Sequence, residues 1–226
     1  MLLAESAFWR HPGGGSLAIR IHGIAAMELK FSALSPYVRK VLVVAHELGI
    51  AERIRITPVN TRQEPEKIAP LNPLGKIPVL VTDGGAVIYD SPVICEFLDA
   101  EYGNHRLLPA SGLRRWEVMT RVALADGLTD AAILVRHERA RPAGLQSAES
   151  VGWQLRKLRT GLDVLEAAAG DVGEAVDMGE IALGCALGYL PLRVEEAAGL
   201  ESWPRLRQWY AALSRRPSFA KTVPVL

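Results

Sequence analysis

The chain has 226 residues, 49% of them hydrophobic, which is enough for two modest domains with a buried core. Its 26 basic and 25 acidic residues give a net charge of +1 without a Lys/Arg-rich block, which argues against nucleic acid and acidic membrane surfaces as partners. The longest strongly apolar run, residues 181–192, is too short to span a bilayer and contains glycines, so we expect a soluble protein.

Residues 1–26 differ from the rest of the chain in having a run of three glycines and little periodicity. They do not resemble a signal peptide, because charged residues and a glycine interrupt the apolar residues of 17–24. We expect either a disordered extension or an upstream start codon ahead of the true beginning at Met27.

The two cysteines, Cys95 and Cys185, both lie among apolar residues with helical spacing. A cysteine in such a setting is most often a buried, reduced thiol that packs as a small hydrophobic side chain. We therefore expect neither a disulfide nor a catalytic cysteine, and a reducing cytoplasm is the compartment that suits the chain.

An alternation of strand and helix patterns begins at Met27. The strand patterns alternate apolar and polar residues, as Ile54 and Ile56 do with their arginine neighbours, and the helix patterns repeat every three or four residues. The expected order is β-α-β-α-β-β-α, followed by a polar linker at 103–110. Strands are expected at 28–33 and 53–59, helices at 36–48, 65–69 and 92–101, and a hairpin at 78–81 and 86–89.

Everything after about residue 111 has a helical pattern. The clearest apolar stripe runs through 151–169 and ends at Gly170. Asp177 and Glu180 then form a capping-box pattern at the start of a helix that is apolar on most sides, which predicts the centre of a second domain. A last amphipathic helix stops near Pro217. These patterns indicate packing more than chemistry.

The segment 72–80, N-P-L-G-K-I-P-V-L, combines two prolines and a glycine with the apolar residues of a short buried strand. An X-Pro bond at the mouth of a strand is a candidate cis peptide. A cis bond between Ile77 and Pro78 would turn the Ile77 backbone outward, toward an extended ligand such as a peptide. The alternative is an ordinary trans turn with Gly75 at positive φ.

Two Ser-Pro pairs lie on either side of this segment, and each precedes a helical pattern. Serine suits the N-cap and proline the first position of a helix, so Ser35 and Ser91 are expected to cap helices that begin at Pro36 and Pro92. Each helix N-terminus offers free N–H groups and partial positive charge to an anion. One of these helix N-termini suits a thiolate, and the other suits a carboxylate.

Three motifs, S-P-Y-V-R-K, N-P-L-G-K-I-P-V-L and D-S-P-V-I-C-E-F-L, occur in an order and spacing that resembles soluble glutathione S-transferases, in particular a bacterial serine-type member. The resemblance runs from about Met27 to the C-terminus. It implies a thioredoxin-like α/β domain with a mixed four-stranded sheet at 27–105 and an all-α helical domain with the second-substrate site at 111–226. It also implies a homodimer in which the first domain of one subunit packs against the second domain of the other.

The resemblance places Ser35 at the position of the serine or cysteine that lies next to the glutathione sulfur. A hydroxyl group at a helix N-terminus can stabilise a thiolate, although an isolated Ser-Pro is more often only a helix cap. Ser32 is the rival for this role. Tyr37, one turn into the helix, is interpreted as part of the second-substrate wall or as packing.

The resemblance also implies the contacts of the rest of the tripeptide. The backbone of Ile77, before the cis Pro78, would pair with the cysteinyl unit. Asp90 would bind the γ-glutamyl ammonium and Ser91 the γ-glutamyl carboxylate, although aspartate has a shorter reach than the glutamate often found in this motif. The glycine carboxylate would meet one of two basic residues that could equally be solvated surface charges: Lys76 or Arg62.

Charged residues interrupt the apolar pattern of 121–141. They are interpreted either as a solvated face or as a polar wall of the second-substrate pocket or of a subunit interface: Asp126, Asp130, Arg136, His137 and Arg139. His137 has no partner at the spacing of a metal site, so none is expected.

We therefore predict a cytoplasmic glutathione transferase in which the glutathione thiolate attacks a small electrophile. Glutathione is its co-substrate, and no metal or redox cofactor is expected. The first alternative is a glutathione-dependent disulfide reductase that uses the glutathione sulfur itself, since Ser35 replaces the cysteine of a glutaredoxin-type mechanism. The second is a non-catalytic binding protein with the same fold.

Overall fold

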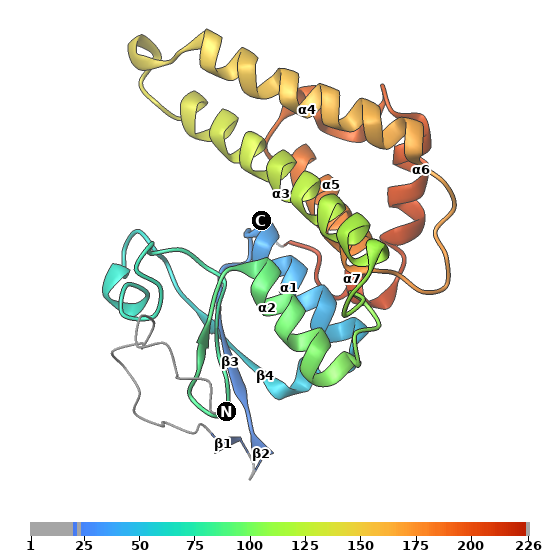
Figure 1. The fold of residues 1–226 in the computed structure, drawn as a ribbon. Helices are drawn as coiled ribbons and strands as arrows, with labels where there is room; N and C mark the ends of the chain where they lie inside the picture. The colour runs from blue at the N-terminus through green and yellow to red at the C-terminus, as the bar shows by residue number, and fades with distance from the viewer. Residues whose placement is uncertain (1–19, 22–23, 225–226) are drawn as a thin grey trace, which may run out of the picture.

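The computed structural model describes residues 20–21 and 24–224. The N-terminal half contains a four-stranded sheet in the order β4-β3-β5-β6 (Figure 1). Strand β3 pairs parallel with β4 and antiparallel with β5, so the sheet is mixed, as expected. The strands are β3 Met27–Phe31, β4 Ile54–Pro58, β5 Val79–Val81 and β6 Val87–Ile88.

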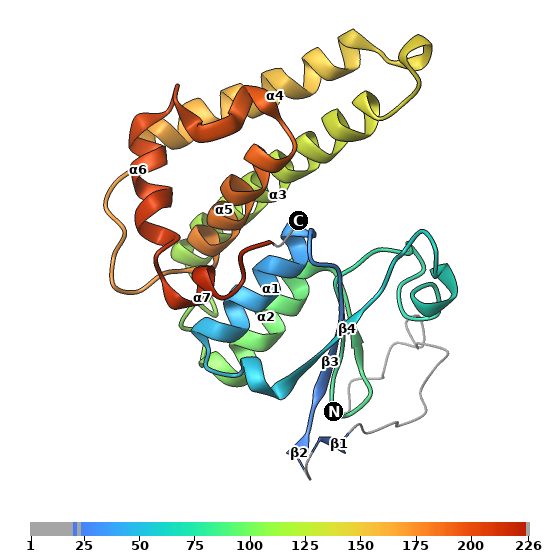
Figure 2. The same ribbon diagram turned by 180° about the vertical axis from the view of Figure 1, so that it is seen from behind.

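Two helices cover the face of the sheet that is turned toward the C-terminal half: α1 Pro36–Glu47 and α2 Ser91–Leu98. Figures 1 and 2 show both of them between the sheet and the later helices. Val41 of α1 and Ile94 of α2 are completely buried, so the core of this half forms between sheet and helices. The short 3-10 helix η1 Ala51–Arg53 leads from α1 into β4.

Two predicted helices differ from the structure at their ends. The helix expected at 65–69 is only the 3-10 turn η2 Pro65–Lys67, and the helix expected at 92–101 ends at Leu98 and continues as the π-helical turn η3 Asp99–Gly103. The prediction that Ser91 caps α2 is wrong, because Asp90 is the N-cap and Ser91 is the first helical residue. Proline is tolerated throughout the first helical turn, whose N–H groups lack helical acceptors, so Pro92 does not fix the start.

The C-terminal half is entirely helical. Its two long helices, α3 Leu113–Arg139 and α4 Ala148–Ala168, run as a hairpin joined through η4 Ala143–Leu145 (Figure 2). Helix α5 Met178–Tyr189 packs against α3, and nearly all of its residues are buried, as its apolar pattern predicts. The remaining elements are η5 Leu190–Leu192, η6 Glu195–Leu200, α6 Pro204–Leu213 and α7 Pro217–Ala220.

The start of α5 has the predicted capping box. The Glu180 backbone N–H donates to Asp177 Oδ1 at 3.1 Å, and the Asp177 N–H donates to Glu180 Oε2 at 2.9 Å. Both N–H groups would otherwise lack acceptors at the helix end, so the two side chains fix where this buried helix begins.

A cluster of charged and polar groups joins α1 to α7. Glu47 accepts hydrogen bonds from Arg216 Nε at 3.0 Å, from Arg216 Nη2 at 2.9 Å and from Ser218 Oγ at 2.5 Å. Burial disfavours the charged form of Glu47, but the bonds from Arg216 and Ser218 outweigh it and hold the Glu47 pKa below its ordinary value. This cluster ties the end of the chain to the first helix of the sheet half.

Both cysteines are free and buried, as predicted. Burial raises the pKa of Cys95 to about 12 and that of Cys185 to about 11, so both are protonated at neutral pH. Most of the extension expected at 1–26 lies outside the described residues. Within its described part, the short strands β1 Arg20–Ile21 and β2 Ile24–Ala25 pair with each other. No helix in the described part of the chain is both long and apolar enough to cross a membrane.

Candidate functional site

Ser35 lies at the N-terminus of α1, as the Ser-Pro pattern predicts. It has an extended backbone, and its Oγ accepts the Val38 N–H at 3.3 Å, which is the geometry of an N-cap. A hydroxyl group that accepts one N–H keeps its own hydrogen for donation to another partner. The cap therefore leaves Ser35 able to hydrogen-bond an anion placed at the positive end of the helix.

The proline segment forms a tight loop before β5. The Ile77–Pro78 peptide is cis, as predicted, and Gly75 has a φ of +63°. The buried Asn72 closes the loop from inside, because its Nδ2 donates to the Lys76 carbonyl at 2.9 Å and its Oδ1 accepts the Leu74 N–H at 3.0 Å. The loop thus presents Ile77 to the solvent-filled space beside α1.

Two cavities adjoin this loop, one of about 800 Å³ and one of about 410 Å³. Tyr37 and Ile77 line both of them, so these two side chains form the boundary between the cavities. Each cavity also takes part of its wall from α3, which means that both form where the sheet half meets the helical half. We call them the small cavity and the large cavity.

The small cavity has an acidic wall. Asp90 lines it from the start of α2, and Asp126 and Asp130 line it from α3. Burial raises the pKa of Asp126 despite Lys40, whose Nζ lies 2.7 Å from Oδ1 and 2.9 Å from Oδ2 of that carboxylate. Asp90 and Asp130 raise the same pKa further. Such surroundings favour a positively charged group.

Tyr37 closes this wall from α1, because its hydroxyl group donates a hydrogen bond to Asp130. Burial, followed by this bond, raises the pKa of Tyr37 above its ordinary value. Tyr37 therefore stays protonated and acts here as a donor across the two halves.

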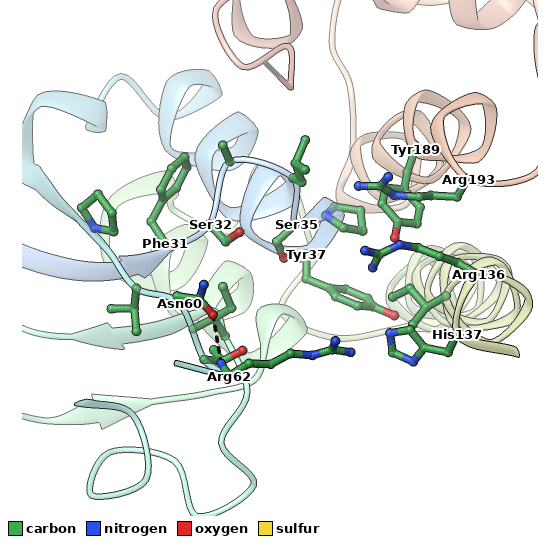
Figure 3. Close-up of a pocket in the computed structure, with 18 of the residues that line it drawn as sticks. Phe31, Ser32, Ser35, Tyr37, Asn60, Arg62, Arg136, His137, Tyr189 and Arg193 are labelled. Atoms are coloured by element: carbon green, nitrogen blue, oxygen red, sulfur yellow. Dashed lines mark hydrogen bonds between the residues drawn. The ribbon is translucent and has the colours of Figure 1, made fainter. Parts of the chain in front are cut away.

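The large cavity has a basic wall instead. Arg136 and His137 line it from α3, Arg193 from the turn after α5, and Arg62 from the loop after β4 (Figure 3). Figure 3 shows the Arg62 side chain extended toward His137, across from Ser35. The pKa of His137 is lowered by burial and by the positive charges of Arg136 and Arg62. Any anion that enters this cavity meets several cationic groups at once.

The structure brings the predicted glutathione residues to these two adjoining cavities. Ser35 and its rival Ser32 line the large cavity, together with Arg62. Ile77 lines both, and the others line the small cavity: Lys76, Pro78, Asp90 and Ser91. Lys76 and Arg62, the two candidates for binding the glycine carboxylate, therefore line different cavities.

The charged residues that the sequence analysis singled out on α3 lie in three different surroundings. Asp126 and Asp130 line the small cavity, and Arg136 and His137 line the large one. Arg139 lines neither and forms a salt bridge with Glu196 instead. No group of three or more His, Cys, Asp or Glu in the described residues could hold a metal ion.

Sequence reasoning missed three residues of the site. Tyr189 and Arg193 line the large cavity from the end of α5 and the turn that follows it, and Lys40 neutralises Asp126 from inside α1. Lys40 is only 1% exposed, and a lysine on the buried side of an amphipathic helix is a signal that the sequence did contain. Nothing local in the sequence marks Tyr189 or Arg193.

Both halves of the chain are similar to known proteins. Residues 34–101 match the glutathione S-transferase N-terminal domain family, and residues 122–212 match the glutathione S-transferase C-terminal domain family. The chain is 38% identical over 202 residues to the uncharacterized GST-like protein YibF of Escherichia coli (strain K12), covering 88% of this chain and 98% of that protein. It is 31% identical over 219 residues to glutathione S-transferase 3 of Zea mays, covering 90% and 96%.

A solved structure is similarly close. A glutathione transferase family member from Pseudomonas fluorescens Pf-5 with bound glutathione has a TM-score of 0.84 and 38% identity, covering 89% of this chain and 100% of that chain. The same family member with bound S-(propanoic acid)-glutathione has a TM-score of 0.79 and 38% identity, covering 88% and 100%. The matching domains, relatives and fold lead to one conclusion: this chain belongs to the glutathione S-transferase family.

Proposed function

We propose that this protein is a serine-type glutathione transferase that binds glutathione, lowers the pKa of its thiol at Ser35 and directs the thiolate at a small electrophile. The observation that carries this proposal is the position of Ser35, at the N-terminus of α1 in the wall of the basic large cavity, which adjoins the acidic small cavity. The relative from Pseudomonas fluorescens with bound glutathione supports it. Glutathione serves as co-substrate, without a metal or redox cofactor.

The small cavity suits the γ-glutamyl end of glutathione. Its carboxylates attract the ammonium group, with Asp90 as the direct partner, while Ser91 and the free N–H groups of α2 receive the carboxylate. The Ile77 backbone pairs with the cysteinyl unit, which brings the sulfur to the boundary near Ser35. The glycine carboxylate then falls to Lys76 or Arg62.

The energy required of Ser35 is modest. Lowering a thiol pKa by about two units requires about 2.7 kcal/mol of selective stabilisation. A hydrogen bond from a hydroxyl group to a thiolate, together with the positive end of a helix, supplies energy of that order. Neither cavity has a cysteine in its wall, and both cysteines are buried and protonated, which supports the serine rather than a protein thiol.

Calorimetric titration with glutathione tests the binding site. Asp90→Ala and Ser91→Ala should each weaken binding about 5- to 150-fold, because each removes a charge partner or a hydroxyl group from a desolvated ligand. Asp171→Ala, on an exposed loop that belongs to neither cavity, is the matched control and should bind as the wild type does. Unchanged affinity in both site variants would refute this site.

Activity assays test the reaction class. We expect catalysed conjugation of glutathione to a chloroarene and no reduction of hydroxyethyl disulfide. The opposite pattern would favour a disulfide reductase. Activity with neither substrate, together with weak glutathione binding, would favour a binding protein.

A homodimer is also part of this proposal. Exposed apolar side chains lie at the start of the helical half and on the neighbouring α2, including Val93, Leu113 and Trp116. These surfaces suit the packing of the sheet half of one subunit against the first helices of the other. Light scattering at micromolar concentration should give the dimer mass, and a monomer mass would contradict it.

A further inference from the structure

Three basic residues of the helical half face Ser35 across the large cavity. Arg136 and His137 occupy adjacent positions near the end of α3, and Arg193 follows α5; we call them the basic cluster. Figure 3 shows their side chains directed toward the space around Tyr37. Because all three belong to the helical half, they form part of the wall that a second substrate would contact.

The positive charge of the cluster is not balanced within the described part of the protein. Neither Arg136 nor Arg193 forms a salt bridge with a described carboxylate, and Arg193 Nε is buried without a hydrogen-bond partner. Glu64 is the carboxylate in the wall of this cavity, and it is already bound to Lys67 and to the Asn60 N–H. The guanidinium groups of the cluster therefore lack a described carboxylate partner and can offer donors to an anionic ligand.

The remaining contacts of the cluster are too weak to satisfy it. Arg193 Nη1 reaches only the Leu192 carbonyl, at 3.4 Å, and its guanidinium lies 5.6 Å from the centre of the Tyr189 ring. Burial lowers the pKa of His137, and the positive charges of Arg136 and Arg62 lower it further, so cationic side chains lie close together in this part of the cavity. A guanidinium offers paired donors that match the geometry of a carboxylate.

We propose that the second substrate is a small electrophile that carries a carboxylate or a similar oxyanion, bound by the basic cluster with its electrophilic carbon toward Ser35. This inference rests on the proposed transferase function and adds the substrate class. With a chloroarene as the electrophile, the reaction is a substitution. The glutathione thiol proton goes to solvent, and the electron pair of the thiolate forms the new C–S bond. The C–Cl bond of the chloroarene breaks at the same carbon, and chloride leaves with its electron pair.

Product analogues with and without the charge test this inference by calorimetry. S-(2-carboxyethyl)glutathione and S-propylglutathione differ mainly in the carboxylate, and glutathione itself is titrated beside them. We expect the carboxylate analogue to bind about 10-fold more tightly than the propyl analogue, from one charge-assisted contact in a partly exposed site. The preference should decrease at about 0.5 M salt, because the cluster is open to solvent.

Variants that each remove one positive charge test which residues cause the preference for the carboxylate analogue. Arg136→Gln and Arg193→Gln should each reduce the preference about 3- to 10-fold. Arg207→Gln removes the same charge from an exposed position of α6 outside both cavities and should leave the preference unchanged. A kinetic counterpart compares kcat/KM for 4-chloro-3,5-dinitrobenzoate with that for its neutral carboxamide, each corrected for the uncatalysed reaction.

The outcomes separate the two levels of the proposal. If wild-type protein fails to bind glutathione, the proposed function fails and the inference fails with it. If glutathione binds but the two analogues bind equally, only the inference is overturned. The inference is also overturned if both arginine variants keep the full preference for the carboxylate analogue. The same holds if the variants weaken the binding of unmodified glutathione as much as they weaken the binding of the carboxylate analogue.

Discussion

The small and large cavities carry opposite charge although they share a boundary and one helix. Asp126 and Asp130 lie over the small cavity, and Arg136 and His137 lie over the large one, all on α3. Ten residues of helix separate Asp126 from Arg136, or about 15 Å along the axis. A single helix therefore contributes charges of opposite sign to the two cavities.

The two ends differ in how the protein treats its own charge. At the acidic end Lys40 pairs with Asp126, and the Tyr37 hydroxyl group bonds to Asp130, so these carboxylates are partly compensated before any ligand arrives. The guanidinium groups of Arg136 and Arg193 have no described carboxylate in salt-bridge contact. The acidic end is therefore partly compensated by contacts within the fold, whereas the two arginines of the basic end have no such compensation among the described residues.

The largest effect is expected at the helix N-terminus in the wall of the large cavity. Ser35→Ala should lower transferase turnover about 10- to 1000-fold while glutathione affinity changes little, because the hydroxyl bond strengthens only when the sulfur is charged. The pKa of bound glutathione, followed by thiolate absorbance, should rise. Full turnover in this variant would show that Ser35 is only a helix cap, and Ser32 would be tested next.

A second substitution at this position gives a qualitative result. Ser35→Cys places a thiol at a helix N-terminus, where its pKa is lowered and it can form a mixed disulfide. After exposure to oxidised glutathione, intact mass spectrometry should show one added glutathionyl group in the variant and none in the wild type, whose cysteines are buried. An unmodified variant would place the sulfur elsewhere.

An intermediate effect is expected from breaking the compensation at the acidic end. Lys40→Met leaves Asp126 without its cation and should lower the free energy of unfolding by about 2 to 3 kcal/mol at neutral pH. Burial already raises the pKa of Asp126 above 3.8, so the folded chain binds this proton more readily than the unfolded chain does. The deficit should therefore shrink as the pH falls through the raised pKa of the variant.

Urea unfolding at several pH values measures this deficit. The double variant Lys40→Met/Asp126→Asn should recover part of the lost stability, because no uncompensated charge remains. If the single variant is as stable as the wild type at neutral pH, the acidic end does not depend on Lys40.

The smallest effect is expected from a contact outside both cavities. Glu47→Gln removes the charge that pairs with Arg216 and should cost about 1 to 2 kcal/mol of stability at neutral pH, since the pair keeps some solvent contact. Because the Glu47 pKa is lowered, its contribution is present above the ordinary value of 4.5 and is lost as the pH falls through the lowered value. The deficit should thus disappear at a lower pH than in Lys40→Met.

This variant also serves as the reference for both cavities. Glutathione affinity and the preference for carboxylate-bearing ligands should match the wild type, because Glu47 lines neither cavity. A change in either would mean that the contact between α1 and α7 shapes the cleft.

Local chemistry in the sequence predicted the elements and much of the site. Ser35 before Pro36 predicts a capped helix, the two prolines of 72–80 predict a loop before a buried strand, and Asp177 with Glu180 predicts a helix start. Each of these signals works within a few residues, through backbone dihedrals and the unpaired N–H groups of a helix end. Helix ends were less certain, as at Ser91, because several residues satisfy the same first turn equally well.

Only the tertiary structure decided which charges meet. Lys40 and Asp126 are 86 residues apart, and Glu47 and Arg216 are 169 apart, so no local pattern links them. In the sequence, the charged residues of α3 fitted either a solvated face or a polar wall of a pocket or subunit interface. The packing of α3 against α4 and α5 fixes which turn of the helix lies over which cavity. A helix that is polar at several positions has no preferred side until its apolar stripe is buried.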